Sequence, residues 1–173
     1  FFFKQKTAYE ILTCDWSSDV CSSDLGGSPF EGSPVDMARM VPRLGIDISQ
    51  AIDMAERGGG SYIAVGSIAG VRASTVIGAY GISKAADHML VKNLAAEWGP
   101  KRVRVNAIAP GFIETDMTRA LTEEQRQALL QQIPLQRFGH AGEIASVAVF
   151  LASPAAGYIT GETIQVNGGM FMG

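Results

Sequence analysis

Three side chains of this sequence could act together on a polar bond. Tyr80 and Lys84 lie four residues apart, and Ser67 precedes Tyr80 by thirteen residues. A spacing of four residues places two side chains on the same face of a helix. A phenol alone is a poor acid–base catalyst at neutral pH, because its unperturbed pKa is about 10, but a neighbouring lysine ammonium favours the phenolate. A hydroxyl donor, a phenol and a cation therefore suit proton transfer to or from a carbonyl or alcohol oxygen.

The elements around these residues come in the order that would bring them together. An apolar run predicts a strand over 62–65, with Ser67 at its carboxyl end. The pattern of 79–98 predicts a long helix closed by a Gly-Pro pair, and 103–109 predicts a second strand. Alternating strands and helices indicate right-handed crossovers and a parallel sheet, which binds ligands at the carboxyl ends of its strands.

The other predicted elements flank this centre. They are a helix near 46–57, a charged amphipathic segment over 122–133, a helix over 141–152 and a short strand over 163–166. The three glycines at 58–60 lead into a strand and do not join a strand to a following helix. They therefore form a turn and not a dinucleotide phosphate loop.

Composition excludes several classes of protein. The chain has 173 residues, 47% hydrophobic and 18% charged, and a net charge of −3, which describes a globular protein with a core. A nucleic-acid-binding surface would be basic, and a membrane span would need about 18 apolar residues in a row, so neither is predicted. We predict no metal site, because Cys14 and Cys21 lie in a segment that looks foreign to the rest.

That segment, residues 1–25, has no apolar period typical of a helix or strand. Codons for 4–11 and 15–25 resemble the adapter oligonucleotides used in short-read DNA sequencing, so we interpret 1–25 as a translated artefact or disordered leader. The alternative is a natural leader without regular structure. Residues 26–45, which begin rich in Gly, Ser and Pro, are interpreted as a linker or irregular segment, and 46–173 as the folded part.

A set of motifs in the folded part resembles the short-chain dehydrogenases/reductases. The first group is Ser67, Tyr80-x-x-Ser83-Lys84 and Asn106-x-x-x-Pro110-Gly111-x-Ile113-x-Thr115, and the second is Tyr158-Ile159-Thr160-Gly161-Glu162 with Val166-Asn167-Gly168-Gly169. The resemblance implies an α/β fold, here the carboxyl-terminal half of a truncated Rossmann-like, doubly wound parallel sheet with three strands. The part over 111–172 is most similar to 3-oxoacyl-[acyl-carrier-protein] reductases, whereas 55–110 is closer to other carbonyl-reducing members. A join between two genes near residue 110 is therefore one interpretation.

The resemblance also implies roles. Tyr80 would protonate the carbonyl oxygen, Lys84 would hold the ribose hydroxyls of the cofactor, and Ser67 would bind the substrate oxygen. The residues that would line the nicotinamide side are Pro110, Gly111, Ile113 and Thr115. The segment 117–132 would correspond to the family's substrate lid.

Simpler interpretations stay open for several of these residues. Pro110 and Gly111 suit a plain turn, and Thr115 suits a helix N-cap. His88 and His140 suit surface or capping positions. Arg102 and Arg104 suit a solvated strand edge, and we assign them no partner.

The sequence departs from the family pattern in two respects. It shows no glycine-rich turn after a first strand and no residue to read the adenosine ribose. The family's catalytic asparagine would fall near 39–44, yet the first asparagine is Asn93. We therefore expect a fragment that lacks an upstream half on the order of 100 residues, binds the cofactor weakly or not at all, and is inactive alone.

For the parent enzyme the resemblance implies reduction of a carbonyl to an alcohol with NADP or NAD, NADPH being favoured. A 3-oxoacyl thioester is the first choice of substrate, and a small ketone or aldehyde is the alternative. We expect a cytoplasmic homotetramer that acts on small or acyl-carrier-linked substrates. A non-catalytic oligomerisation module on the same scaffold is the second hypothesis.

Overall fold

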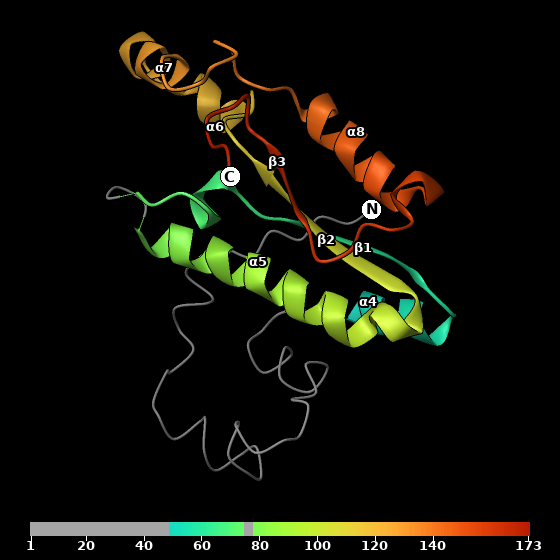
Figure 1. Cartoon of the computed structure of the whole chain (residues 1–173). Coiled ribbons are helices and arrows are strands. Elements are labelled where there is room, and N and C mark those ends of the chain that lie inside the picture. The colour runs from blue at the N-terminus through green and yellow to red at the C-terminus, as the bar shows by residue number, and fades with distance from the viewer. Residues whose placement is uncertain (1–48, 75–77) are drawn as a thin grey trace, which may run out of the picture. The chain divides into compact units, whose positions relative to one another are not determined.

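The computed structural model describes residues 49–74 and 78–173, most of which belong to one compact unit, Asp53–Gly173 (Figure 1). The predicted leader at 1–25, with both cysteines, and the predicted linker at 26–45 lie outside the described residues. Among the described helices, none has the length and apolar character needed to cross a membrane.

A parallel sheet of three strands runs through this unit in the order β1-β2-β3. The strands are β1 (Gly60–Val65), β2 (Val103–Pro110) and β3 (Thr163–Val166). Gly60 pairs with Val103 at one end of the first ladder, and Pro110 pairs with Val166 at the far end of the second. All three predicted strands are therefore confirmed, and β1 and β2 are slightly longer than predicted.

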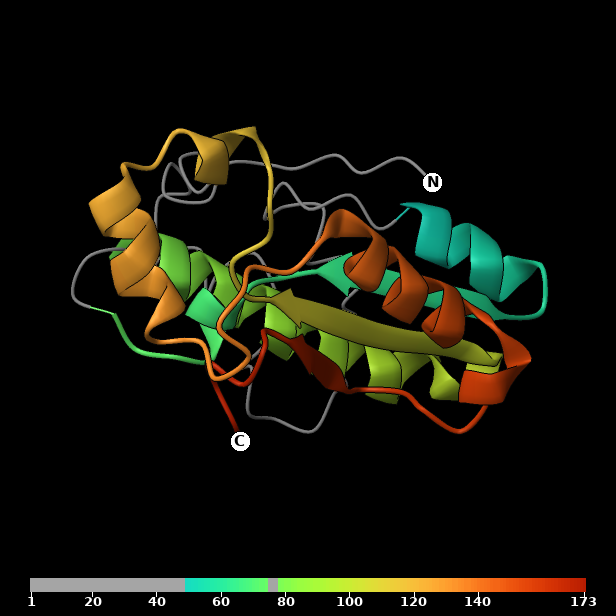
Figure 2. The same ribbon diagram turned by 90° about the horizontal axis from the view of Figure 1, so that it is seen from above.

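Two long helices cover opposite faces of the sheet, as Figure 2 shows: α5 (Gly78–Trp98) lies on one face and α8 (Ala141–Ala152) on the other. The remaining helices are α4 (Ser49–Glu56), α6 (Asp116–Arg119) and α7 (Glu123–Leu130). The short 3-10 turns are η2 (Ile68–Gly70), η3 (Gly99–Lys101) and η4 (Pro154–Ala156). The predicted helices are confirmed within a few residues of their ends, and α6 and the 3-10 turns were not predicted.

Local sequence explains where several elements begin. Gly58 and Gly59 have φ of 91° and 135°, a left-handed region that favours glycine, and they turn the chain from α4 into β1 as predicted. Thr122 caps α7: its hydroxyl accepts from the Gln125 N–H at 3.3 Å, and the Gln125 side chain accepts from the Thr122 N–H at 3.0 Å.

The core has two layers because β2 points alternate residues to opposite faces. The face toward α5 carries buried Val103, Val105, Ala107 and Ala109, and the helix contributes Val91, Leu94, Ala95 and Trp98. The opposite face carries Ile108, which packs in a cluster with Leu151 of α8. Burial on both faces is expected for the middle strand of a parallel sheet.

One prediction about this sheet is wrong. Arg104, expected on a solvated edge without a partner, donates to the Leu151 carbonyl at 2.7 Å and to the Ser153 carbonyl at 3.3 Å. It lies on the face of β2 that α8 covers, so its guanidinium satisfies carbonyls at the carboxyl end of that helix. Arg102 is exposed and precedes β2.

Candidate active site

Ser67 lies at the carboxyl end of β1, as predicted. Gly66 is tied to the sheet because its N–H donates to the Ile108 carbonyl at 2.9 Å. Ser67 then caps η2: its Oγ accepts from the Ala69 N–H at 3.1 Å. Because Oγ acts as the acceptor in that bond, the hydroxyl hydrogen can still be donated to a bound oxygen atom.

Tyr80 and Lys84 lie in the first turns of α5. The Lys84 ammonium is 5.9 Å from the centre of the Tyr80 ring and forms an ion pair with Asp87 at 2.9 Å. Tyr80 is 37% exposed, so its ring is accessible from solvent. Buried Ser83 supports this turn by donating to the Tyr80 carbonyl at 2.8 Å. Sequence reasoning missed Asp87, although its spacing of three residues from Lys84 is a usual one for helical ion pairs.

The Ser67 turn packs directly on this part of α5. A Cβ placed on Gly70 would lie 2.6 Å from the Lys84 carbonyl carbon, and one on Gly81 would lie 2.9 Å from the Ala69 carbonyl oxygen. Both separations are too short for any side chain, so glycine is required for the close approach. The turn that carries Ser67 therefore lies against the turns of α5 that carry Tyr80 and Lys84, at the carboxyl edge of the sheet.

The predicted nicotinamide-side residues follow β2 at the same edge. Pro110 ends β2, and the Gly111 N–H donates to the Val166 carbonyl at 3.0 Å. Ile113 forms an isolated parallel bridge with Gly139. Thr115 immediately precedes α6, the N-cap position that the simpler interpretation allowed, and its N–H donates to the Thr118 hydroxyl at 2.8 Å.

Ionic and aromatic contacts fasten α7, which lies in the predicted lid, to this segment. Arg126 of α7 pairs with Glu114 at 2.8 Å and lies 4.6 Å from the centre of the Phe138 ring. Phe138 in turn stacks on Phe112, with 5.9 Å between the ring centres. The hydrogen bond from Arg126 lowers the pKa of Glu114. The Glu114 carboxylate therefore stays charged at neutral pH and holds α7 beside the end of β2.

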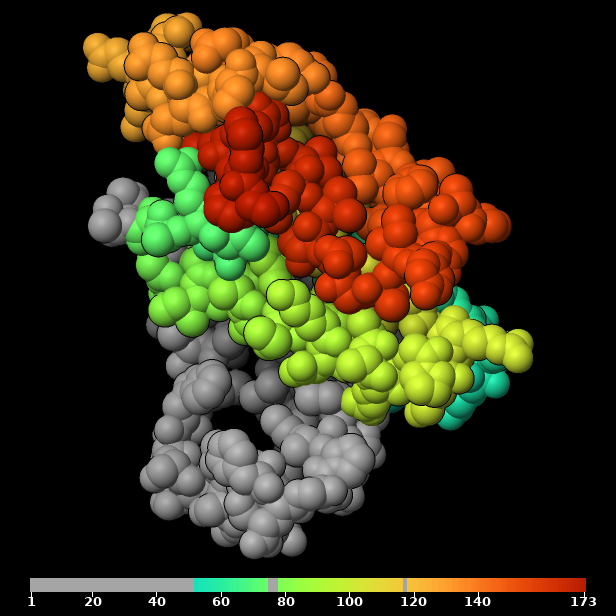
Figure 3. All heavy atoms as spheres, in the orientation of Figure 1, coloured from blue at the N-terminus to red at the C-terminus, as the bar shows by residue number. Residues whose placement is uncertain are grey.

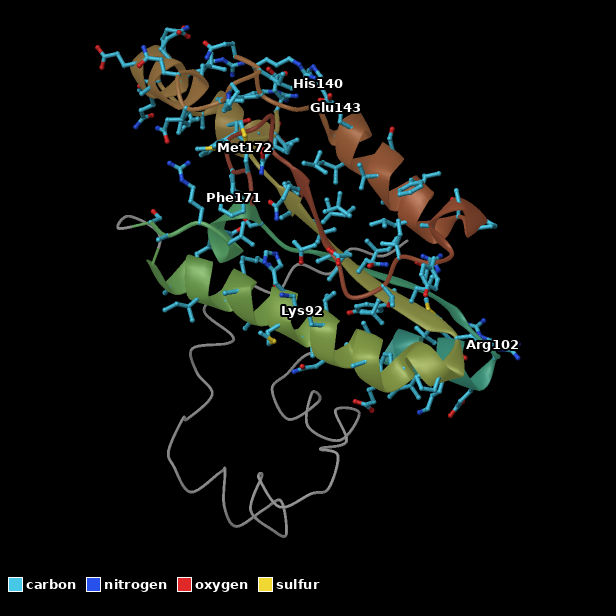
Figure 4. All side chains as sticks on the ribbon, viewed as in Figure 1. Lys92, Arg102, His140, Glu143, Phe171 and Met172 are labelled. Carbon is cyan, nitrogen blue, oxygen red and sulfur yellow. The ribbon has the colours of Figure 1, made fainter. Side chains whose placement is uncertain are left out.

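A second ion pair holds the start of α8. Arg137 donates to both carboxylate oxygens of Glu143, at 2.7 and 2.8 Å, and Glu143 also accepts from the His140 N–H at 2.8 Å. These hydrogen bonds lower the pKa of Glu143 to about 2. His140 and Glu143 lie together at the first turn of α8 in Figure 4, so the capping interpretation of His140 is confirmed.

A hollow of about 560 Å³ opens beside these residues. Its walls come from the segment after β2, the segment after α7, and β3 with the residues that follow it, and they include Phe112, Pro134, Gln165 and Phe171. Figure 3 shows the carboxyl-terminal residues in red between the η2 region in green and α7 and α8 in orange. The end of the chain, with Phe171 and Met172, is thus part of the wall of this hollow, which Ile113 also lines.

His88 contradicts its predicted surface or capping position. It is 6% exposed, and neither ring nitrogen has a hydrogen-bond partner in the described part of the chain. Burial lowers the pKa of His88, so the ring is neutral at neutral pH. The side of α5 that packs on the sheet includes this histidine, which the polar residue type alone did not indicate.

The three-stranded parallel sheet with helices on both faces, and the packing of the Ser67 turn on α5 at the carboxyl ends of its strands, define an α/β protein with a Rossmann-like fold. Residues 46–171 match the model of a protein family described as Enoyl-(Acyl carrier protein) reductase. The chain belongs to the short-chain dehydrogenases/reductases.

Within this family, the chain is similar to individual proteins named as 3-oxoacyl-[acyl-carrier-protein] reductases. The chain is 51% identical over 113 residues to the 3-oxoacyl-[acyl-carrier-protein] reductase of Vibrio cholerae, a match that covers 65% of this chain and 46% of the relative. A solved structure of the reductase of the same name from Brucella melitensis is 33% identical with a TM-score of 0.69, covering 79% of this chain and 49% of that one.

A short-chain dehydrogenase/reductase structure from Mycobacterium ulcerans is 35% identical with a TM-score of 0.68, covering 78% of this chain and 47% of that one. The chain thus spans about half the length of the curated relatives it matches.

Proposed function

We propose that this chain carries the catalytic half of an NAD(P)(H)-dependent reductase that converts a carbonyl to an alcohol. The observation that carries the proposal is the packing of the Ser67 turn on the Tyr80–Lys84 turns of α5. That packing supports a site in which a hydroxyl donor, a phenol and a cation would act together at the carboxyl edge of a parallel sheet.

The donor set fits a nicotinamide cofactor. Lys84 is a cation of low exposure (13%) next to an accessible phenol, which suits ribose hydroxyls and a carbonyl oxygen at the same place. Ribose contacts would come from Tyr80 and Lys84, and the nicotinamide side would be lined by Pro110, Gly111, Ile113 and Thr115. When bound, the cofactor would supply the hydride.

The chain's own residues supply the proton and orient the substrate carbonyl. The Ser67 hydroxyl donates to the substrate oxygen and fixes the carbonyl in place. The Tyr80 hydroxyl gives its proton to that oxygen as negative charge develops there. The nearby Lys84 cation stabilises the phenolate that remains, while Asp87 holds the ammonium at 2.9 Å and fixes its position.

We assign a 3-oxoacyl thioester as the substrate, with NADPH as the favoured cofactor. Support comes from the similarity to the Vibrio cholerae reductase, whose name gives 3-oxoacyl-[acyl-carrier-protein] as its substrate. A small ketone or aldehyde is the second candidate, favoured by the motifs of 55–110. We also assign the intact enzyme to the cytoplasm as a homotetramer, in line with the family resemblance.

The test is a hybrid in which the upstream half of the Vibrio cholerae reductase is joined to residues 46–173 of this chain. We expect the hybrid to oxidise NADPH in the presence of a 3-oxoacyl thioester, with a higher kcat/KM than for a small ketone of equal reactivity. A reversed preference would overturn the substrate assignment.

The second candidate function is a non-catalytic oligomerisation module. A hybrid that binds NADPH and assembles, yet reduces neither substrate, would support the module and contradict the proposed reductase. The chain alone gives a further check, because we expect little or no NADPH binding in a fluorescence titration. Tight binding by the chain alone would contradict that expectation.

A further inference from the structure

His88 continues the chemically active face of α5 into the core. Tyr80, Lys84 and His88 follow one another at spacings of four residues, so they form one stripe along the helix. His88 is the buried member, with 6% exposure and two ring nitrogens that have no hydrogen-bond partner in the described residues. An unpaired buried polar group destabilises a fold relative to an apolar side chain of similar shape. A histidine at this position therefore needs a functional explanation.

The imidazole lies directly against the backbone of Gly66. A Cβ placed on Gly66 would be 2.3 Å from Nε2 and 2.8 Å from Cδ2 of His88, which leaves no room for any side chain. Gly66 cannot retreat easily, because its N–H is bonded to Ile108 of the central strand. The ring is therefore wedged between the sheet and α5, one residue before Ser67.

The wedge completes a set of contacts on both sides of Ser67. Gly66 meets His88, whereas Gly70, on the other side of Ser67, meets the Lys84 carbonyl. We propose that His88 is a positioning residue: its ring acts as a spacer that sets where Ser67 lies relative to Tyr80 and Lys84. The catalytic consequence of this spacing rests on the proposed reductase function.

The charges around His88 come from its own helix. Burial is the largest influence and lowers the pKa of His88; Asp87 raises it, and Lys84 and Lys92 lower it. Lys92, labelled in Figure 4, lies one turn further along α5. The segment 60–70 and the α5-facing residues of β2 contain no charged side chain. A neutral His88 ring is therefore favoured at this position, because protonation would introduce a buried cation next to two lysines.

The contact itself is tested on the chain with four proteins: the parent, Gly66→Ala, His88→Ala and the double variant. We expect Gly66→Ala to lower the urea midpoint of the parent strongly, because the new methyl group meets the ring. In the His88→Ala background the same change has less than half that effect, since the obstacle is gone. Equal effects of Gly66→Ala in both backgrounds would overturn the proposal.

The positioning role is tested in the hybrid with His88→Leu, which has no unpaired nitrogen and a similar volume, but which is branched where the ring is planar and so cannot reproduce the close approach to Gly66. We expect a urea midpoint equal to or above that of the parent, together with a kcat at least about 10-fold lower and KM values within about two-fold, because misplaced reacting groups slow the chemical step. His88→Asn, which keeps a polar side chain but is shorter, is expected not to restore kcat.

A failure of the proposed reductase function and a failure of the positioning role of His88 give different results. A parent hybrid without turnover contradicts the proposed function. The contact between the His88 ring and Gly66 is then tested by the urea midpoints of the chain alone. Turnover in the parent hybrid with an unchanged kcat in His88→Leu contradicts the positioning role and leaves the proposed function intact.

Discussion

Asn106 gives the most quantitative prediction, because the structure shows both ends of its buried side chain in use. The amide Nδ2 donates to the Ile159 carbonyl at 2.9 Å, and Oδ1 accepts from the Glu162 N–H at 3.1 Å. The side chain is fully buried and fastens β2 to the loop that leads into β3. Replacing Asn106 with alanine removes both hydrogen bonds and leaves a small cavity.

The expected loss follows from the two groups left behind. An unpaired buried carbonyl or N–H costs about 1–3 kcal/mol. Ile159 is a partly buried residue, so most of this cost is expected at its carbonyl, whereas Glu162 is an exposed residue and its N–H is expected to contribute less. We therefore expect Asn106→Ala to lower the free energy of unfolding by about 2–4 kcal/mol, a large part of the total of about 5–15 kcal/mol typical of a domain.

Urea denaturation followed by circular dichroism measures this change. A loss of that size shifts the midpoint by about 1 M or more, given a typical slope of about 1–3 kcal/mol per molar urea. Asn93→Ala is the matched control, because Asn93 is exposed on α5 and alanine is a better helix former; its midpoint is expected to stay equal or rise. Equal midpoints for Asn106→Ala and the parent would refute the reasoning.

Two other substitutions test the loop contact of Gly111 and the ion pair of Glu143. Gly111→Ala is expected to destabilise the chain by about 1–3 kcal/mol in urea denaturation, because its Cβ would lie 2.8 Å from Cα of Asn167. Gly142→Ala is the control: a Cβ at this position in α8 meets nothing within 4 Å, so this change is expected to stabilise the chain. A Gly111→Ala variant as stable as the parent would contradict the contact with Asn167. Glu143→Gln is expected to lower the melting temperature at pH 7. Since the Arg137 bonds lower the folded-state pKa of Glu143 to about 2 from 4.5, the parent's advantage is present above pH 4.5 and lost as the pH falls toward 2; an advantage that persists at pH 2 would contradict it.

The periodic patterns of the sequence predicted most of the fold for a physical reason. The strands and the long helices carry their apolar residues at the spacing of their own geometry, so 141–152 and 163–166 were placed at their observed ends. Ser67 and Tyr80 were expected at one edge because a strand, a turn and a returning helix leave little freedom of topology.

Contacts between distant segments were beyond such reasoning. Arg104 was expected to be solvated, and only the packing of α8 on the sheet shows that its guanidinium meets the Leu151 carbonyl. His88 was expected near the surface, because a polar residue type does not reveal which side of a helix faces a sheet. Asn106 belonged to a motif, yet its buried bonds to the 159–162 loop appear only in three dimensions.

The central claim is that Tyr80 transfers the proton, and a matched pair of tyrosine variants tests it most directly. Tyr80→Phe removes one hydroxyl from the candidate site, whereas Tyr158→Phe removes one from a fully exposed ring beyond η4. In the hybrid with the Vibrio cholerae upstream half, we expect Tyr80→Phe to lower kcat for the 3-oxoacyl thioester by about 10²–10⁴-fold, and Tyr158→Phe to leave it within about two-fold. Turnover by Tyr80→Phe equal to that of Tyr158→Phe would contradict the account.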